Sequence, residues 1–176
     1  MGKFKPLLSY RGKSFIQNIV EKLIIVCDKI IIVTGFNADD VQNNVRQVKV
    51  NSKIEFVVNS EYEKGMFTSL QAGLKVAKNS DWNLYHFVDQ PGLPENFYAN
   101  FIKQIDNKHN WVQPSFNELR GHPILICRSL YDLIINESEN SSLREISKNP
   151  IVKKKFWDCE IKEILQDFDT EEDLPT

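Results

Sequence analysis

The sequence predicts an α/β domain built around a mostly parallel sheet. Residues 30–34, 54–58 and 84–88 form three mainly apolar runs, each of which ends at a glycine or a polar residue. Strands that are buried on both faces have near-continuous apolar runs of this kind. Because segments with helical spacing separate the runs, we expect right-handed crossover connections and parallel strands.

Three helices are predicted, one before the first strand and one in each connection. Ser14–Gln17 has the pattern of a capping box, and the apolar residues after it recur at helical spacing. Asn37 or Asp39 is the expected N-cap of a short helix that ends at Val45. The third helix is expected over 66–77, between the second and third strands.

Composition restricts the class of protein. With 176 residues and 41% hydrophobic content, the chain is expected to form one domain over residues 1–176. A net charge of −2 argues against a nucleic-acid partner. Cys27, Cys127 and Cys159 are isolated in the sequence, which favours reduced thiols in the cytoplasm over a disulfide framework or a zinc site. No apolar stretch approaches the roughly 20 residues that span a bilayer, so no membrane partner is expected.

Ligands of open α/β sheets bind beyond the carboxyl ends of the strands. The first predicted strand ends at Gly35, the second is followed by a loop that contains Gly65, and the third ends at Asp89. An acid at a buried strand end, followed here by Gln90 and Pro91, commonly presents its carboxylate to a metal ion. A plain Asx turn is the alternative for Asp89.

Two later segments carry further polar candidates. The turn 121–123 presents His122 just before the apolar run 124–126, and Asp167 and Asp169 lie on one side of the chain if that segment is extended. Two carboxylates about 4 Å apart repel by about 4 kcal/mol at an effective dielectric of 20, so a cation is expected if Asp169 converges with Asp89. Alternatively, Asp169 caps a terminal helix.

Six segments together resemble the MobA-like nucleotidyltransferases, most closely the molybdenum cofactor cytidylyltransferase branch. They are "MGKFKPLL", "VTGF", "NSEYEKGMFTSLQAGL", "DQP", "RGHPIL" and "DFDTEEDL", and they extend over nearly the whole chain. The resemblance implies a three-layer α/β/α, Rossmann-like nucleotide-diphospho-sugar transferase fold. It also implies that the first strand and most of a glycine-rich loop are absent before Met1, which would leave a slot in the sheet between two unpaired apolar edges.

The resemblance also implies an activity and a set of site residues. The activity is transfer of CMP from CTP to a molybdopterin-type acceptor with release of pyrophosphate. Lys5 matches the lysine that neutralises the triphosphate, Gly35, Gly65 and Ser69 fall on the nucleotide side, and Asp89 and Asp169 match the carboxylates that hold Mg²⁺. The acceptor side is assigned to Arg120, Gly121, His122 and Pro123.

A purely structural role is the alternative for several of these residues. Lys5 can be a solvated terminal cation, Thr68 or Ser69 can be a simple helix cap, and residues 121–123 can be a structural turn. Two other functions stay open as well. One is a non-catalytic nucleotide- or cofactor-binding accessory protein for a molybdenum hydroxylase, and the other is a nucleotidyltransferase for another phosphorylated acceptor such as a sugar phosphate.

Overall fold

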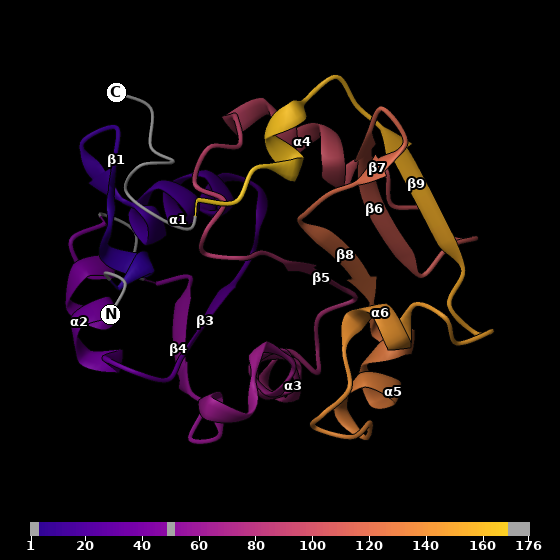
Figure 1. Cartoon of the computed structure of the whole chain (residues 1–176), viewed down its shortest axis with the longest axis horizontal. Coiled ribbons are helices and arrows are strands. Elements are labelled where there is room, and N and C mark those ends of the chain that lie inside the picture. Colours follow the sequence, from indigo (N-terminus) through magenta and orange to yellow (C-terminus); the bar gives the residue numbers. More distant parts are fainter. Residues whose placement is uncertain (1–3, 49–51, 169–176) are drawn as a thin grey trace.

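The computed structural model describes residues 4–48 and 52–168 (Figure 1). Its strands are β1 (Ser9–Tyr10), β2 (Lys13–Ser14), β3 (Ile30–Thr34), β4 (Ile54–Val58), β5 (Trp82–Tyr85), β6 (Trp111–Phe116), β7 (Leu119–Arg120), β8 (Ile124–Cys127) and β9 (Lys154–Asp158). Its helices are α1 (Phe15–Val26), α2 (Ala38–Val45), α3 (Met66–Val76), α4 (Glu95–Ile102), α5 (Tyr131–Ile135) and α6 (Leu143–Ile146). Short 3-10 turns are η1 (Lys5–Leu7), η2 (Tyr62–Lys64), η3 (Arg128–Leu130) and η4 (Lys162–Leu165).

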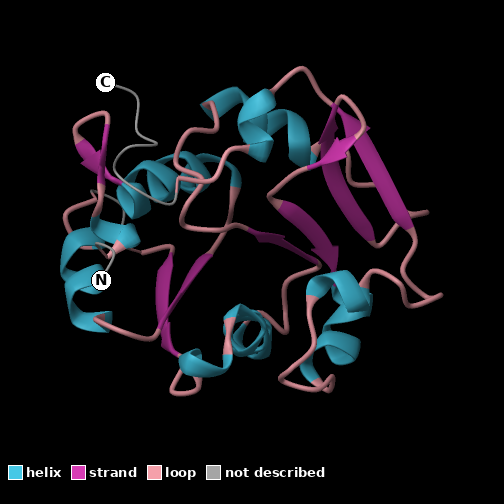
Figure 2. Cartoon of the chain, viewed as in Figure 1, coloured by secondary structure: helices cyan, strands magenta, loops and turns pink. Residues whose placement is uncertain are grey.

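Apart from the short β1–β2 hairpin, the strands form two groups (Figure 2). Strand β3 pairs with β4 in parallel over five residue pairs. In the second group β5 pairs antiparallel with β8, β8 antiparallel with β6, and β6 in parallel with β9, while β7 forms a hairpin on β6. The predicted α/β class is confirmed, with antiparallel pairs in the group that contains β8 and in the short β1–β2 hairpin.

Helices cover both faces of the strands, with α1 and α4 on one side and α3, α5 and α6 on the other (Figure 1). Alternate residues of one strand enter different cores: Leu125 packs with α1 and α4, whereas Ile124 and Ile126 pack with α3 and α5. This alternation is the two-residue period of a strand that is buried on both faces. The expected three-layer arrangement is therefore confirmed.

A third, smaller core joins the two ends of the chain. Tyr10, Phe15 and Phe168 are all buried, and the Tyr10 and Phe168 ring centroids lie 5.4 Å apart. Phe15 begins α1 directly after its N-cap Ser14, whose side chain forms the predicted capping box with Gln17. The aromatic cluster of Tyr10, Phe15 and Phe168 thus fixes the last described residue against the first helix.

One local prediction was confirmed and one was wrong. Asn37 is the N-cap of α2, as predicted, although it has a left-handed backbone with φ of 53° and makes no side-chain capping hydrogen bond. The third strand was expected over 84–88, whereas β5 ends at Tyr85. Tyr85 pairs with Ile124, and the residue before Ile124 is Pro123, which has no N–H to continue the ladder.

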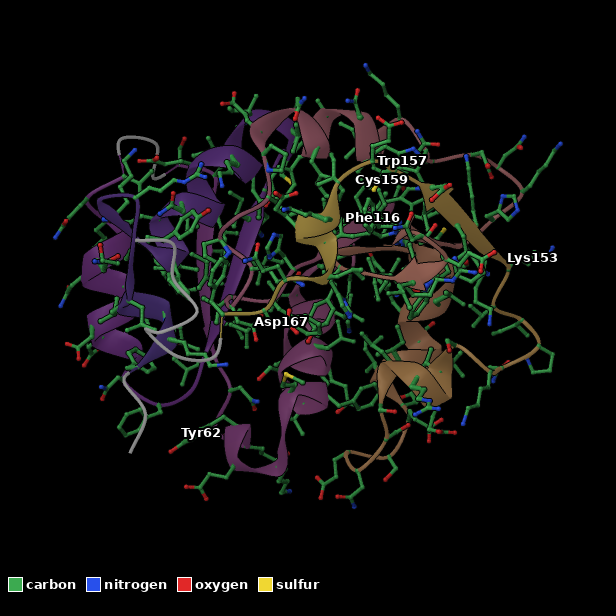
Figure 3. The ribbon with its side chains drawn as sticks, turned by 45° about the horizontal axis from the view of Figure 1, so that its top comes forward. Tyr62, Phe116, Lys153, Trp157, Cys159 and Asp167 are labelled. Carbon is green, nitrogen blue, oxygen red and sulfur yellow. The ribbon has the colours of Figure 1, made fainter. Side chains whose placement is uncertain are left out.

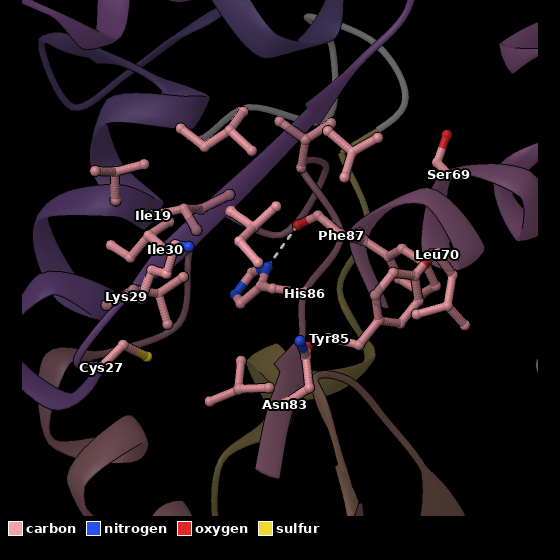
Figure 4. Close-up of a pocket in the computed structure, with 18 of the residues that line it drawn as sticks. Ile19, Cys27, Lys29, Ile30, Ser69, Leu70, Asn83, Tyr85, His86 and Phe87 are labelled. Atoms are coloured by element: carbon pink, nitrogen blue, oxygen red, sulfur yellow. Dashed lines mark hydrogen bonds between the residues drawn. The ribbon is translucent and has the colours of Figure 1, made fainter. Parts of the chain in front are cut away.

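A cavity of about 880 Å³ separates the two groups of strands. Within the described residues β3 pairs only with β4, and β5 pairs on one side only, with β8. Residues of both strands line the cavity, together with apolar side chains of α1 and α3 such as Ile19 and Leu70 (Figure 4). The cavity therefore lies between two strand edges that have no partner strand among the described residues.

His86 lies in the wall of this cavity, between β5 and Ile30 (Figure 4). Its Nδ1 lies 2.6 Å from the carbonyl of Phe87, which only accepts, so Nδ1 carries the proton. Its Nε2 then accepts from the hydroxyl of Tyr98 at 2.8 Å. Burial lowers the pKa of His86 from its ordinary value of 6.5 to about 4.

The depressed pKa of His86 predicts acid sensitivity. The unfolded chain takes up a proton below pH 6.5 that the folded chain accepts only near pH 4, so the stabilisation is present above pH 6.5 and is lost as the pH falls toward 4. At 1.36 kcal/mol per pH unit the expected loss is roughly 3 kcal/mol. Urea unfolding at pH 7 and pH 4 measures it, with His86→Gln as the control. The same decline in both proteins would contradict the prediction.

No helix in the described ranges is both long and apolar enough to cross a membrane.

Candidate active site

The carboxyl edge of the strands brings the N-terminal lysine to the predicted acid. Lys5 begins η1, and Asp89 follows β5 in the loop that leads to α4. The Nζ of Lys5 lies 3.7 Å from Oδ2 of Asp89, and the two side chains are 33% and 26% exposed. Both side chains are therefore partly buried, and part of each is still accessible to solvent.

A second lysine holds the loop that follows Asp89. The Nζ of Lys22, on α1, donates to the carbonyl of Pro91 at 2.7 Å and to that of Leu93 at 2.8 Å. Burial lowers the pKa of Lys22 from its ordinary value. Hydrogen bonds from an ammonium group are stronger than neutral ones, so Lys22 fixes the turn on which Asp89 is carried.

The loop between β4 and α3 is ordered by a glycine N-cap and by hydrogen bonds between its own side chains. Gly65 is the N-cap of α3 with φ of 113°, a conformation that favours glycine. Thr68 donates to the carbonyl of Gly65 at 2.8 Å, and Nδ2 of Asn59 donates to the hydroxyls of Thr68 and Ser69. Asn59 and Thr68 thus order the loop, while Ser69 also lines the cavity beside β3.

Gly35 lies against the same loop from the end of β3. A Cβ at Gly35 would lie 2.4 Å from both Cβ and Cγ of Tyr62, which no side-chain rotation of Tyr62 can fully relieve. Tyr62 itself is 39% exposed, and the neighbouring Phe36 and Met66 are 60% and 69% exposed. The close approach explains why this position takes glycine, independently of any contact to a nucleotide.

We expect Gly35→Ala to displace the loop that carries Tyr62. Overpacking of this kind typically costs 1–3 kcal/mol, so thermal stability falls and the KM for the nucleotide rises. Thermal denaturation and steady-state kinetics measure the two effects. Adding Tyr62→Gly removes the clashing atoms and is expected to restore much of the stability; no restoration would locate the defect elsewhere.

Residues 121–123 form a turn against the C-terminal segment. The N–H of His122 donates to the carbonyl of Ile164 at 3.0 Å, and a Cβ at Gly121 would lie 2.5 Å from that same oxygen. The peptide bond between His122 and Pro123 is cis. The ring of His122 packs on Phe87 with centroids 4.4 Å apart, and burial lowers the pKa of His122 from its ordinary value.

Unlike Gly121 and His122, which lie against the C-terminal segment, Arg120 packs on an aromatic ring of β9. Its guanidinium carbon lies 3.7 Å from the ring centroid of Phe156, on β9. Both side chains lie on the surface, where Arg120 on β7 packs against the parallel pair β6–β9. This contact gives Arg120 a structural role. To bind an acceptor as predicted, the guanidinium would have to leave the ring of Phe156.

Asp169 lies outside the described residues, so its predicted approach to Asp89 stays a prediction. Asp167 is placed: its Oδ1 accepts from Nε2 of Gln90 at 2.8 Å. Figure 3 shows Asp167 on the segment that leads from η4 back toward the N-terminal half of the molecule. Among residues 4–48 and 52–168, no three His, Cys, Asp or Glu side chains are grouped closely enough to hold a metal ion.

Four of these residues were not found as site residues from the sequence: Asn59, Lys22, Gln90 and Tyr62. Asn59 lies within the quoted loop segment and bonds residues of that same segment. Tyr62 and Gln90 lie within quoted segments too, but their contacts, with Gly35 and Asp167, are with residues far away in the chain. Lys22 gives no local signal at all, because it is one polar residue on an amphipathic helix.

Comparisons with known proteins fit this geometry. Residues 1–154 match the model of the family described as MobA-like NTP transferase domain. The molybdenum cofactor cytidylyltransferase of Escherichia coli (strain K12) is 24% identical over 178 residues, covering 100% of this chain and 88% of the relative. The nicotine blue oxidoreductase of Paenarthrobacter nicotinovorans is 25% identical, covering 97% of this chain and 85% of the relative.

Solved structures share the fold. A nucleotidyl transferase from Methanothermobacter superposes with a TM-score of 0.78 at 19% identity, covering 96% of this chain and 81% of that one. A Mycobacterium tuberculosis H37Rv protein crystallised with manganese superposes with a TM-score of 0.76 at 15% identity, covering 98% of this chain and 89% of that one. With the family match over most of its length, the chain belongs to the MobA-like NTP transferase family and is a nucleotidyltransferase.

Proposed function

We propose that residues 1–176 act as a single domain that transfers CMP from CTP to a molybdopterin-type cofactor with release of pyrophosphate. The observation that carries the proposal is the placement of Lys5 3.7 Å from Asp89 at the carboxyl edge of the strands. The Escherichia coli relative, named as a molybdenum cofactor cytidylyltransferase and matched over the whole chain, supports the choice of nucleotide and acceptor.

In the proposed reaction a phosphate oxygen of the acceptor attacks the α-phosphorus of CTP. The bond from that phosphorus to the bridging oxygen breaks, and pyrophosphate leaves with the electron pair. Catalysis of this kind depends on positioning and on charge neutralisation. The ammonium of Lys5 binds the triphosphate oxygens, and the free N–H groups at the start of α3, after Gly65, face the nucleotide side.

The residues present suit a hard divalent cation. Mg²⁺ prefers oxygen ligands and is usually held by one or two carboxylates together with substrate phosphates. Asp89 supplies one carboxylate that is only partly exposed, and we propose Asp169 as the second. Bound there, Mg²⁺ would offset the negative charge that develops as pyrophosphate leaves.

The acceptor is assigned to the turn at 121–123. His122 is mainly neutral at pH 7 because burial lowers its pKa, so one ring nitrogen is able to accept a hydrogen bond. Within the described part of the chain its buried Nδ1 has no hydrogen-bond partner. A pterin ring carries N–H donors that match such an acceptor; because Nδ1 is buried, the proposed contact requires the ring of His122 to turn outward when the cofactor binds.

Pyrophosphate release by the purified chain with Mg²⁺ and molybdopterin tests the proposal. We expect CTP to support the reaction at least 10-fold better than GTP, a range typical of pocket selectivity. Release with a sugar phosphate but not with molybdopterin would favour another acceptor. Tight nucleotide binding without release would favour the accessory-protein function, which the open cavity beside β3 makes a specific second candidate.

A further inference from the structure

Three large apolar side chains are exposed where β3 and β4 end. Phe36 follows β3, Tyr62 belongs to η2, and Met66 begins α3. Single exposed apolar residues are common on soluble proteins, but a group of them around one hollow typically marks a binding site. These three side chains all line the cavity between β3 and β5. They are therefore a group at one mouth of the cavity, at the carboxyl ends of the strands.

Phe4 extends this group to the N-terminal segment. Its ring meets the ring of Phe36 edge to face, with centroids 5.9 Å apart and planes at 79°. Phe4 also lines the cavity, and the next residue, Lys5, reaches Asp89. The apolar group thus lies directly beside a cation of the candidate active site. We refer to Phe4, Phe36, Tyr62 and Met66 as the apolar rim.

The rings of Phe36 and Tyr62 are held in place but are not covered. Cβ and Cγ of Tyr62 pack so closely on the backbone at Gly35 that a side chain there would overlap them. Phe36 is held by the edge-to-face contact with Phe4. Within the described part of the chain, neither ring has another ring stacked face to face on it. Aromatic rings favour offset-stacked partners, so both offer a face to a planar ligand.

The surroundings of the apolar rim favour a ligand that also carries negative charge. Lys5 supplies an ammonium group, and Gly65, the N-cap of α3, has no side chain to cap the first N–H groups of that helix. Both features favour an anion. An apolar peptide or the apolar face of a second copy would leave this positive potential unused. A nucleotide uses both parts, because it carries a planar base and phosphates only a few bonds apart.

We propose that Phe36 and Tyr62 form a stacking platform for the nucleotide base, beside the phosphate-binding groups at Lys5 and at the start of α3. This inference rests on the proposed function, because it assumes that the nucleotide enters at the carboxyl edge. Stacking on aromatic rings is tolerant of the identity of the base, since every base has a π face. The platform therefore raises the affinity for CTP and GTP alike, and other groups choose between them.

Equilibrium binding of CTP, GTP and inorganic tripolyphosphate to the full chain, measured by isothermal titration calorimetry with Mg²⁺ present, tests the proposal without turnover. Loss of a stacked ring typically costs about 5–150-fold in affinity. We therefore expect Phe36→Ala and Tyr62→Ala each to weaken CTP binding at least fivefold, and the ratio of CTP to GTP affinity to stay within about threefold. Tripolyphosphate has no base, so its affinity is expected to stay within about twofold of the wild type.

Two conservative variants separate stacking from simple loss of bulk. Tyr62→Phe keeps the ring and is expected to bind CTP within about twofold of the wild type. Phe36→Leu keeps an apolar side chain but has no π face, so it is expected to lose CTP affinity as Phe36→Ala does. This second measurement does not depend on how well the fold tolerates a truncated side chain.

Phe156→Ala is the matched control. Phe156 is also an exposed aromatic residue, but it lies on β9 and packs against Arg120. We expect this variant to bind CTP within about twofold of the wild type. A loss in Phe156→Ala as large as that in Tyr62→Ala would overturn the proposal, because removal of any exposed ring would then have the same effect.

Three other results would also overturn the proposal. Wild-type CTP affinity in either alanine variant would remove that ring from the platform. Equal losses for CTP and tripolyphosphate would show that the ring acts through the loop and not through the base. A wild-type dimer in size-exclusion chromatography that becomes monomeric in Phe36→Ala and Tyr62→Ala, with CTP affinity unchanged, would assign the apolar rim to a second copy.

The wild-type chain separates this proposal from the proposed function. If it binds CTP with the expected dependence on Phe36 and Tyr62 but releases no pyrophosphate with molybdopterin, the platform stands and the proposed transfer reaction is wrong. If it binds neither CTP nor GTP, both proposals are wrong.

Discussion

Replacing Asp89 with asparagine is expected to lower kcat for nucleotidyl transfer at least 100-fold. The amide keeps the size of the carboxylate but removes its charge, so both the pairing with Lys5 at 3.7 Å and the proposed binding of Mg²⁺ are lost. Loss of an outer-shell partner alone costs up to 100-fold in metal sites, and loss of a direct ligand costs more. Pyrophosphate release at saturating CTP and Mg²⁺ measures the effect.

Asp81→Asn is the matched control for Asp89→Asn. Asp81 precedes the same strand, β5, and its side chain is exposed at the opposite end from Asp89. We expect its kcat to stay within about twofold of the wild type. An Asp89→Asn variant that retained a third or more of the activity would remove Asp89 from the reaction and would leave the Lys5–Asp89 pair with a structural role only.

Filling the cavity between β3 and β5 with an extended apolar strand is expected to raise the melting temperature. Five Val and Ile residues, fused ahead of Met1 through a glycine-rich loop, would pair with both free strand edges and cover apolar side chains of α1 and α3. Each net hydrogen bond contributes roughly 0.5–1.5 kcal/mol, and 1 kcal/mol corresponds to about 2–4 °C in a domain of this size. We therefore expect an increase of at least about 4 °C, and faster pyrophosphate release if the loop also reaches the triphosphate.

A fusion of equal length with prolines at two of the five positions is the control. Proline lacks the N–H that the ladder needs, so this fusion is expected to leave the melting temperature unchanged. Amide hydrogen exchange gives a local readout, because protection should rise specifically in β3 and β5. Equal melting temperatures and equal exchange in the two fusions would show that the cavity does not accept a strand.

The sequence predicted those parts of the fold that depend on local patterns. Continuous apolar runs gave β3 and β4 at their observed bounds, and the Ser14–Gln17 pattern gave the start of α1. The end of β5 was misplaced because it depends on its partner: the ladder stops where Pro123 would have to donate, and nothing near residue 85 signals this.

The candidate site residues divide in the same way, into those signalled by local sequence and those that depend on distant partners. Gly65 and Asp89 were identified as candidates because each lies in the loop that follows a strand, and ligands of α/β sheets generally bind at such loops. The contact between Gln90 and Asp167 joins residues 77 positions apart, so no local pattern predicts it. The packing of Arg120 on Phe156 was missed for the same reason, since it requires the parallel pairing of β6 with β9.

The aromatic cluster of Tyr10, Phe15 and Phe168 has a consequence for the order in which the site is made. Tyr10 and Phe15 leave the ribosome well before Phe168, which follows Phe15 by 153 residues (168 − 15). Because translation adds about 5–20 residues per second, Tyr10 and Phe15 are synthesised on the order of ten seconds or more before Phe168. The contacts of Phe168 with Tyr10 and with the carbonyl of Asp89 therefore form only after translation has passed Phe168, so nascent chains that stop before Phe168 are expected to leave the loop at Asp89 without this support.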